Sequence, residues 1–482
     1  MISRVLNCRA LSVVGVLSVG LSGCALGPAY QRPAIDIPAH FHAASERQSG
    51  WKSASPADHL PRGEWWALYQ DAELNALIAR QAQNSPTVAA AEAAFRQARA
   101  LVSASKAAFF PSLDASGART RSGDTGGSSN AIDTRVNARW ELDVWGKLRR
   151  QLEADNASLS ASEADLAAVR LSQQAALVQN YFELRVLDAQ KRLLDATLEA
   201  YRRSLKLSEN QYQAGLVPRS DVTQARVQLK NTEAQRLDLN QQRAALEHAI
   251  AVLVGSAPGS VTLAEREGIP PLPPIPPTLP SALLERRPDV AAAERQVMAA
   301  NAEIGVARSA WFPEVSLSAS GGYRGTQWGG LLSAPNQVWS LGPSIALNLF
   351  DAGRIRAQVE QAEARHAETV ARYRQTVLDA LREVEDSLVQ LSVYAQEAAV
   401  RQDALAAARE SLRLIENQYR AGTVDYLRVA SAQTAALSSE RTVLELTGAQ
   451  LATSVRLMAG MGGSWLTADR PAPAMPRAEH PE

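Results

Sequence analysis

The feature that most constrains this chain is an internal repeat, because a chain that repeats itself folds into two copies of one unit. Residues 204–215, SLKLSENQYQAG, and 411–422, SLRLIENQYRAG, agree at nine of twelve positions with an offset of 207. Residues 86–92 and 288–294 match with an offset of 202. The five-residue difference falls in the segment between these pairs, where hairpin loops tolerate changes of length. The sequence therefore predicts two similar halves.

Each half is predicted to contain a helix, a β-hairpin, a very long helix, a turn and a further helix. The first helix is expected from residue 71 to about 108, and the long helices from 147 to about 212 and from 354 to 419, both free of proline. In the first long helix, Leu152, Leu159 and Leu166 recur every seven residues, which is typical of coiled-coil packing. At 1.5 Å per residue such a helix is about 100 Å long. A protein that spans a cellular compartment needs helices of this length, whereas a globular core does not.

Between the helices the apolar period changes from 3.6 to 2. Val136, Ala138 and Trp140 alternate with polar residues, and residues 315–320 and 339–350 show the same pattern. Strands of about 10 to 13 residues are long enough to cross a membrane when tilted, and the Gly-, Ser- and Asn-rich residues 122–130 and 325–336 are expected as loops. The aromatic residues near the strand ends are typical of an interfacial girdle; they are Trp140, Trp145, Trp311, Trp339 and Phe350. Taken alone, this alternation also fits a soluble antiparallel sheet with one wet face.

The predicted fold is mainly α with a β-barrel contribution: long coiled-coil helices in two repeats and four membrane strands per subunit. Beyond the N-terminal segment no run of about 18 apolar residues lacks charges, so a membrane span would have to be a closed barrel. Four strands are too few, since about eight are the minimum for a closed barrel. Open strand edges in lipid would leave peptide groups unpaired. The sequence therefore predicts that several copies combine their strands.

The N-terminus is predicted to be a lipoprotein signal peptide, residues 1–23. A short apolar segment ends in LSGC, and Cys24 is where a lipobox places the lipid-accepting thiol. An ordinary secretion signal with a chance cysteine is the alternative. Cys8 lies in the discarded segment, so the mature chain is expected to form no internal disulfide. The residue after the lipidated cysteine is Ala25. An aspartate at that position is typical of lipoproteins retained in the inner membrane, so its absence favours the outer membrane.

The remaining boundaries follow from proline content. Residues 24–70 are expected to be a lipidated extended segment, 71–268 the first repeat, and 281–466 the second. The proline-rich residues 269–280 between the repeats are expected to form an extended strap, and residues 467–482 a disordered tail.

Composition argues against several function classes. The 50 acidic and 50 basic residues balance, so no overall charge points to nucleic acid. His40 and His42 are the only close histidine pair, and without a third ligand they predict no metal site. The sequence contains no Gly-x-Ser-x-Gly nucleophile motif and no phosphate-binding loop. We therefore expect no enzyme activity and no cofactor other than the covalent lipid on Cys24.

Several motifs, in order and twice, resemble the outer membrane factor family, the TolC-like channels and most closely the OprM/NodT-type lipoproteins. They are Trp65-Trp66, WELDVWGKLR at 140–149, FDAGR at 350–354, QYQAG at 211–215 and QYRAG at 418–422. The resemblance implies a trimer that forms a twelve-stranded barrel over a helical tunnel. It also implies that the chain is the outer-membrane channel of a tripartite efflux pump, a passive exit duct for small molecules. The implied partners are a periplasmic adaptor (membrane fusion protein) and an inner-membrane transporter of the resistance-nodulation-division type.

The resemblance also implies site residues at the periplasmic end. Gly215 and Gly422 are expected to end the long helices as C-caps and to contact the adaptor. A closed gate is expected to hold Tyr419 bonded to Asp221, although a helix cap and a solvated aspartate are an equal alternative. Val424 replaces the arginine that the family carries there. The pore is expected to be lined at three positions on the following helix, Leu427, Arg428 and Ser431.

Two other functions compete with the efflux duct. One is an export duct like those of type I secretion. The other is a periplasmic coiled-coil scaffold lipoprotein that never spans lipid, which would leave the two hairpins without a purpose.

Overall fold

The computed structural model describes residues 26–38, 51–53, 63–274 and 286–463. Cys24, His40, His42 and the predicted tail lie outside these ranges. The chain divides into two compact units. Unit 1 contains Met1–Ala34, Glu92–Ala164 and Ala291–Thr376; unit 2 contains Ile35–Ala91, Asp165–Val290 and Val377–Glu482.

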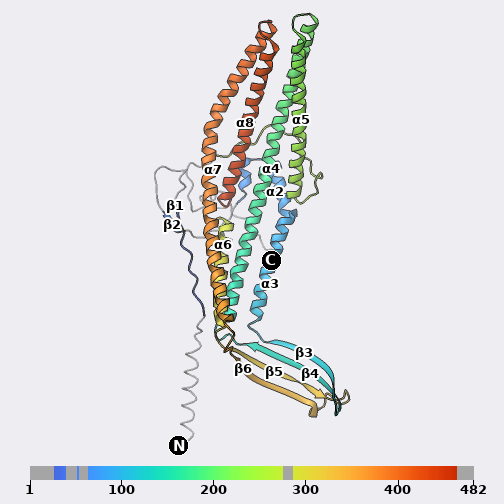
Figure 1. The fold of residues 1–482 in the computed structure, drawn as a ribbon, viewed down its shortest axis with the longest axis vertical. Helices are drawn as coiled ribbons and strands as arrows, with labels where there is room; N and C mark the ends of the chain where they lie inside the picture. The colour runs from blue at the N-terminus through green and yellow to red at the C-terminus, as the bar shows by residue number, and fades with distance from the viewer. Residues whose placement is uncertain (1–25, 39–50, 54–62, 275–285, 464–482) are drawn as a thin grey trace, which may run out of the picture. The chain divides into compact units, whose positions relative to one another are not determined.

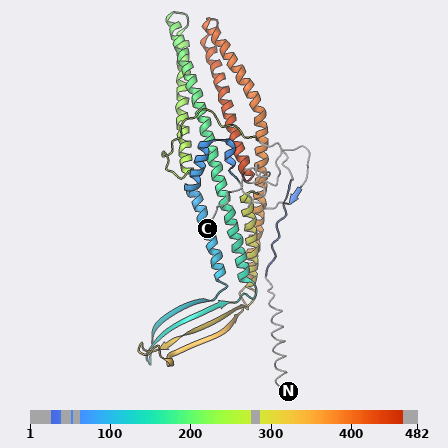
Figure 2. The ribbon, with the colours of Figure 1, turned by 180° about the vertical axis from the view of Figure 1, so that it is seen from behind.

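The helices follow the predicted repeat. The long helices α4 and α7 have 67 residues each, and the helices after them, α5 and α8, have 35 each. Figures 1 and 2 both show each long helix running beside the helix that follows it. No helix within the described ranges combines the length and the apolar character that a membrane crossing needs. The helical bounds are η2 Trp65–Tyr69, α2 Ala72–Asn84, α3 Pro86–Ala107, α4 Lys147–Gln213, α5 Arg219–Leu253, α6 Pro288–Ser309, η4 Ala334–Asn336, α7 Arg354–Arg420 and α8 Tyr426–Gly460.

The predicted first helix is wrong in one respect, because it is two helices. Asp71 caps α2 by accepting the N–H groups of Glu73 and Leu74 at 3.0 and 3.2 Å. At Ser85 the backbone turns extended, and α3 begins at Pro86. Proline lacks an N–H and disfavours a helical residue before it, so it starts a new helix and does not continue the old one.

Four antiparallel strands form one sheet in unit 1, in the order β3 (Ser112–Asp124), β4 (Gly127–Glu141), β5 (Glu314–Gly325) and β6 (Gln337–Ala346). A separate short pair joins β1 (Asp36–Pro38) and β2 (Trp51–Ser53) in unit 2. The four-stranded pairing has no interruption, so the residues opposite one another share a face throughout. Figure 1 shows this sheet as one curved layer.

The register separates the sheet into two chemically different faces. One face, the apolar face, carries Val136, every second residue along β4 from it, and the residues that pair with these on the other strands. Its apolar side chains are Leu113, Ala115, Val136, Ala138, Trp140, Val315, Leu317, Ala319, Trp339, Leu341, Pro343 and Ile345. The polar face carries the intervening residues, among which Ser316 bonds Ser344 at 2.8 Å and Asn137 donates to Asp114 at 2.9 Å. On the apolar face Trp339 is 77% and Ile345 71% exposed. A soluble sheet covers its apolar face with other parts of the protein, and this chain leaves large side chains of that face uncovered.

The strand ends differ from the prediction. Residues 122–130, expected as a loop, are mostly strand, since β3 and β4 are joined by a turn of only two residues, 125–126. β4 stops at Glu141 and β6 at Ala346, earlier than the alternation suggested. Trp145 is not part of an exposed girdle, because its ring packs 5.0 Å from that of Phe312 and its N–H donates to the carbonyl of Pro313.

Aspartates explain why the strands end early. Asp143 accepts the N–H of Leu148 at 2.9 Å at the start of α4, and Asp351 accepts that of Ile355 at 2.8 Å at the start of α7. The bond from Ile355 lowers the pKa of Asp351, so this carboxylate stays charged near the positive end of the helix. Each hairpin therefore leads directly into a capped long helix.

A buried ionic cluster lies in the core of unit 2. Arg185 and Asp188 of α4 are almost fully buried, and their side chains bond at 2.7 Å. Asp188 also accepts from Arg243 of α5 at 2.8 Å, and Arg185 donates to Glu73 of α2 at 2.6 Å. The cluster joins three helices of the first repeat, and each of its buried charges lies beside an opposite one.

Candidate functional site

The two turns that join the long helices to α5 and α8 share one backbone conformation. Gly215 has φ +69° and Gly422 has φ +73°, in the left-handed region where glycine carries no steric penalty. After the first glycine, the N–H of Leu216 donates to the carbonyl of Gln211 at 2.8 Å, and the corresponding bond closes the second turn at 3.0 Å. This is the Schellman arrangement, so the C-cap role predicted for both glycines is confirmed.

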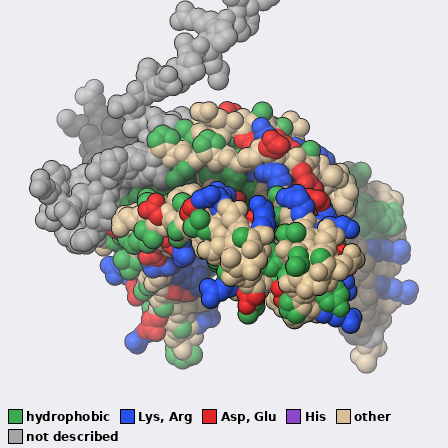
Figure 3. All heavy atoms as spheres, turned by 90° about the horizontal axis from the view of Figure 1, so that it is seen from above, with side chains coloured by type: hydrophobic (Ala, Val, Ile, Leu, Met, Phe, Trp, Pro, Cys, Tyr) green, Lys and Arg blue, Asp and Glu red, His purple; other side chains and the backbone are tan. Residues whose placement is uncertain are grey.

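Both glycines stand in open space. A side-chain carbon added at either would meet no atom within 4 Å, so only the backbone angle restricts these positions. Figure 3 looks at the molecule from the side of these turns and shows acidic, basic and apolar side chains interspersed. Leu216, next to the first glycine, is exposed. The face of the molecule on this side therefore carries both signs of charge.

The predicted bond between Tyr419 and Asp221 does not form. The hydroxyl of Tyr419 bonds instead to that of Ser208 on α4, at 2.9 Å. Asp221, in the first turn of α5, accepts the backbone N–H of Tyr426 at 3.4 Å. Tyr426 is the first residue of α8, where N–H groups have no partner within the helix. Asp221 is therefore neither bonded to Tyr419 nor solvated: it is buried and caps a helix of the other repeat.

Ser208, Asp221, Tyr419 and Tyr426 together form a contact between the two helical hairpins, which we call the clasp. The two tyrosine rings meet edge to face with centroids 5.6 Å apart. Sequence reasoning missed Ser208 and Tyr426. A signal existed for Ser208, because it is one of three positions where the repeated twelve-residue segments differ, with Ile415 in its place.

The clasp tyrosines are neutral over the physiological pH range. Burial raises the pKa of Tyr419 and that of Tyr426 above the ordinary tyrosine value. Their hydroxyls therefore keep their protons, and the contact between Tyr419 and Ser208 is a bond between two neutral hydroxyls.

The three predicted pore residues lie on the exposed side of the first turns of α8. Leu427 is 61% exposed, and Arg428 and Ser431 are also exposed. The N–H of Arg428 is capped by Asp425 at 3.1 Å, and the hydroxyl of Ser431 donates to the carbonyl of Leu427 at 2.9 Å. Arg428 is therefore exposed on the surface of this chain, and its lining role stays a prediction.

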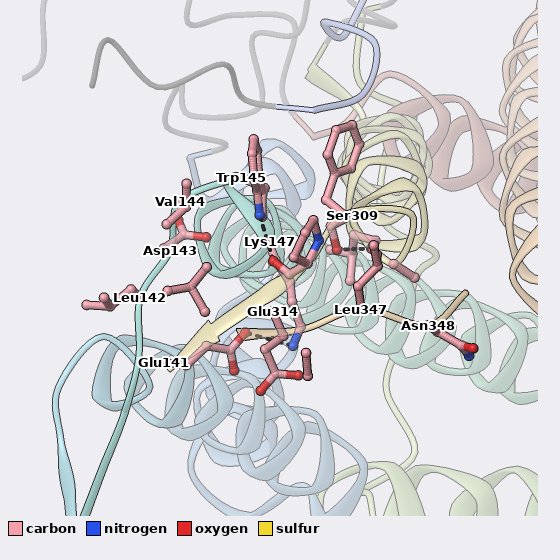
Figure 4. A pocket seen from close by; sticks show the side chains of 16 residues that line it. Glu141, Leu142, Asp143, Val144, Trp145, Lys147, Ser309, Glu314, Leu347 and Asn348 are labelled. Carbon is pink, nitrogen blue, oxygen red and sulfur yellow. Dashed lines mark hydrogen bonds and ion pairs between the residues drawn. The ribbon is translucent and has the colours of Figure 1, made fainter. Parts of the chain in front are cut away.

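A second concave region lies in unit 1, where the sheet meets the helices (Figure 4). This hollow of about 500 Å³ is bordered by Glu141, Trp145, Lys147 and Glu314 among others. Lys147 and Glu141 form an ion pair at 2.8 Å across the end of β4. Figure 4 shows these side chains engaged with one another around the strand-to-helix joint. The contacts hold the joint together.

Metal coordination finds no support in the part of the chain that the structure describes. No group of three or more His, Cys, Asp or Glu side chains there could hold a metal ion.

The comparisons with known proteins agree with this architecture. The chain matches the family described as outer membrane efflux protein over residues 77–256 and 279–463. It is 30% identical to the cation efflux system protein CusC of Escherichia coli O6:H1 over 454 residues, 93% of this chain and 97% of the relative. It is also 30% identical to the solvent efflux pump outer membrane protein SrpC of Pseudomonas putida over 468 residues, 95% of this chain and 98% of the relative.

A solved structure extends the likeness to three dimensions. The outer-membrane channel OprN superimposes with a TM-score of 0.82 at 30% identity, covering 92% of this chain and all of the other. The long helices and the sheet therefore belong to one known arrangement.

Proposed function

Because this chain belongs to the outer membrane efflux protein family, we propose that three copies join their sheets into one closed cylinder in the membrane. The chain is the outer-membrane channel component of an efflux pump, through which small molecules leave the cell.

The observation that carries the proposal is the sheet of unit 1. Its apolar face is exposed, and the edge strands β3 and β6 have no further strand partner among the described residues. In hydrocarbon each unpaired peptide group costs several kcal/mol, so edges of this kind must be paired. Pairing β3 of one copy with β6 of the next would satisfy both edges, with the apolar face toward lipid and the polar face toward the lumen.

Disulfide cross-linking tests this pairing. Asp114→Cys on β3 is combined in turn with Ser340→Cys, Gly342→Cys and Ser344→Cys on β6, which sample three registers. One register is expected to yield cross-linked dimers and trimers in outer-membrane fractions. Ser316→Cys on the central strand β5 is the matched control and should yield none. Monomers in every combination would contradict the proposal.

We propose further that Cys24 carries the lipid. The first described residues after it are held firmly, because Arg150 donates to the carbonyls of Leu26 at 2.9 Å and Gly27 at 3.3 Å. A few residues further on, Arg32 bonds the buried Glu294 at 2.7 Å. Metabolic labelling with palmitate should mark the wild-type chain and not Cys24→Ser. Equal labelling of both would overturn this assignment.

The turns at Gly215 and Gly422 are proposed to contact a periplasmic adaptor, which links the channel to an inner-membrane transporter of the resistance-nodulation-division type. The support is their exposure and their strict backbone. The space around both glycines is open, so only the left-handed backbone angle restricts a substitution there. Asparagine adopts this angle at low cost, whereas the β-branched valine does not.

Adaptor capture tests the contact. Gly215→Val/Gly422→Val should lose co-purification of the adaptor while trimers remain in the membrane, and the matched Gly→Asn pair should retain most of it. Undiminished capture by the valine pair would remove the turns from the interface. Co-purification of the transporter with the wild-type complex tests the third partner.

A further inference from the structure

The apolar face of the sheet is ordered in rows by its register. Each row consists of residues that pair with one another across the strands. With increasing distance from the helices, one row holds Leu113, Ala138, Ala319 and Leu341, and the next holds Ala115, Val136, Gly321 and Trp339. The row after these changes character, with Gly117, Thr134, Tyr323 and Gln337. From Val315 to Tyr323 the face extends about 26 Å along the strand, at about 3.3 Å per residue. With the strands tilted, this approaches the apolar band of about 25 Å that spans an outer membrane.

Charge on this face is confined to one place. Beyond the Gly117 row, β3 places Arg119 opposite Ile132 and Arg121 opposite Asn130. The register gives this face no other Asp, Glu, Lys or Arg at any position of β3 to β6. The polar face, in contrast, mixes both signs: Asp133 alone pairs with Arg135 and Arg324.

Among the side chains that the structure describes, neither arginine forms an ion pair with a carboxylate. Arg121 donates to the hydroxyl of Ser128 at 3.2 Å, a neutral partner on the same face. Ile132, beside Arg119, is buried, as is Leu331 of the following loop. A side-chain carbon added at Gly325, the other neighbour of Ile132, would lie 3.0 Å from Leu331. The arginines therefore stand beside a small packed apolar surface, just past the end of the apolar rows.

We propose that Arg119 and Arg121 bind the phosphate groups of lipid headgroups in the outer leaflet of the membrane. A lipid-facing arginine is least costly at the interface, which fits its place past the apolar rows. The planar guanidinium matches phosphate geometry, and the absence of acids on this face leaves phosphate as the counter-charge. The inference rests on the proposed function, since it needs the apolar face to contact lipid.

Lipid retention by the purified oligomer tests the proposal. Wild type, Arg119→Gln/Arg121→Gln and the control Arg139→Gln, an arginine of the polar face, are reconstituted with phosphorylated lipid A or with its dephosphorylated form. Native mass spectrometry counts the lipids that remain bound. Wild type and the control are expected to retain phosphorylated lipid A at least fivefold better than the double variant. Dephosphorylated lipid A should bind all three equally weakly.

Two results would overturn the proposal. Equal retention by wild type and the double variant would show that the arginines do not bind the headgroup. A double variant recovered only as monomer would place both arginines in the contact between subunits. The cross-linking between β3 and β6 is scored separately, so failure of the trimer is distinguishable from failure of lipid binding.

Discussion

The long helices α4 and α7 have equal lengths and a constant offset of 207 residues, yet their middles differ in chemistry. Phe182 and Val186 of α4 are buried, whereas their counterparts Val389 and Val393 of α7 are 51% exposed each. The buried pair Arg185 and Asp188 has Ser392 and Ala395 as its counterparts. One helix therefore completes a core within its own chain, and the other keeps an apolar surface that the proposed trimer would cover.

The two hairpin ends show the same division on a smaller scale. Tyr419 is 3% exposed and bonded to Ser208, while its counterpart Tyr212 is 45% exposed. Asp221 caps the opposite helix from a buried position, and Arg428, 207 residues later, is exposed. Corresponding positions of the two repeats can thus hold the two hairpins together in one copy and lie exposed at the surface in the other.

The largest expected effect comes from breaking the cluster that only α4 contains. Asp188→Ala leaves Arg185 and Arg243 without their shared carboxylate in a buried setting, which should destabilise the protein by about 3–5 kcal/mol. The matched variant Asp386→Ala on α7 removes an exposed partner of Arg382 and should cost about 0–1 kcal/mol. Urea unfolding of the purified protein measures both, and equal midpoints would contradict the contrast between the helices.

The clasp gives the next largest difference. Tyr419→Phe leaves the buried hydroxyl of Ser208 without its partner. The contact between the two helical hairpins should lose about 1–3 kcal/mol of stabilising free energy. Tyr212→Phe, at the exposed counterpart, should have almost no effect. Amide hydrogen exchange over residues 419–430 reports the opening directly, and identical exchange in both variants would show that the clasp holds nothing.

Alkaline pH should destabilise the first repeat through Tyr181. Burial raises the pKa of Tyr181 to about 12, and its counterpart is Leu388, which does not titrate. In the unfolded chain tyrosine loses its proton near pH 10, so the free energy of unfolding falls as pH rises from about 10 toward 12. Thermal unfolding between pH 8 and 12 measures this loss. The Tyr181→Phe variant should show a shallower decline, and an unchanged slope would refute the assignment.

The smallest effect is expected at Arg428. If three copies bring this side chain to the pore, like positive charges weaken cation preference. Arg428→Ala should then make the pore modestly more cation-selective in planar bilayers, and the matched exposed Arg219→Ala of the first repeat should change it less. A strongly cation-selective wild-type pore that Arg428→Ala leaves unaltered would remove Arg428 from the lining.

Much of the fold was predictable because its signals are local. The proline-free heptads predicted both long helices to within one residue at each end, and the glycines at 215 and 422 predicted the turns. Alternation predicted the sheet and its two faces. The errors occurred where a nearby residue competes with the pattern: Pro86 divides a helix, and Asp143 starts α4 while apolar alternation continues through Val144.

The site was less predictable, because its partners are distant in sequence. Tyr419 and Asp221 were placed correctly in one region, but the actual partners, Ser208 and Tyr426, depend on how each helix is rotated about its axis. A rotation of one residue, about 100°, redirects a side chain to a different neighbour. No local pattern specifies that rotation.

By itself, the sequence determined the duplication, the period of each element and the bounds of the long helices, since each follows from backbone preferences over a few positions. Only the tertiary structure decided which of the two long helices, equal in length, is buried in its middle, which tyrosine finds a hydroxyl and where charge falls on the sheet. Those outcomes depend on register and packing between segments some 200 residues apart, as in the pair Ser208 and Tyr419. A contact of that kind exists only when both segments are already in place.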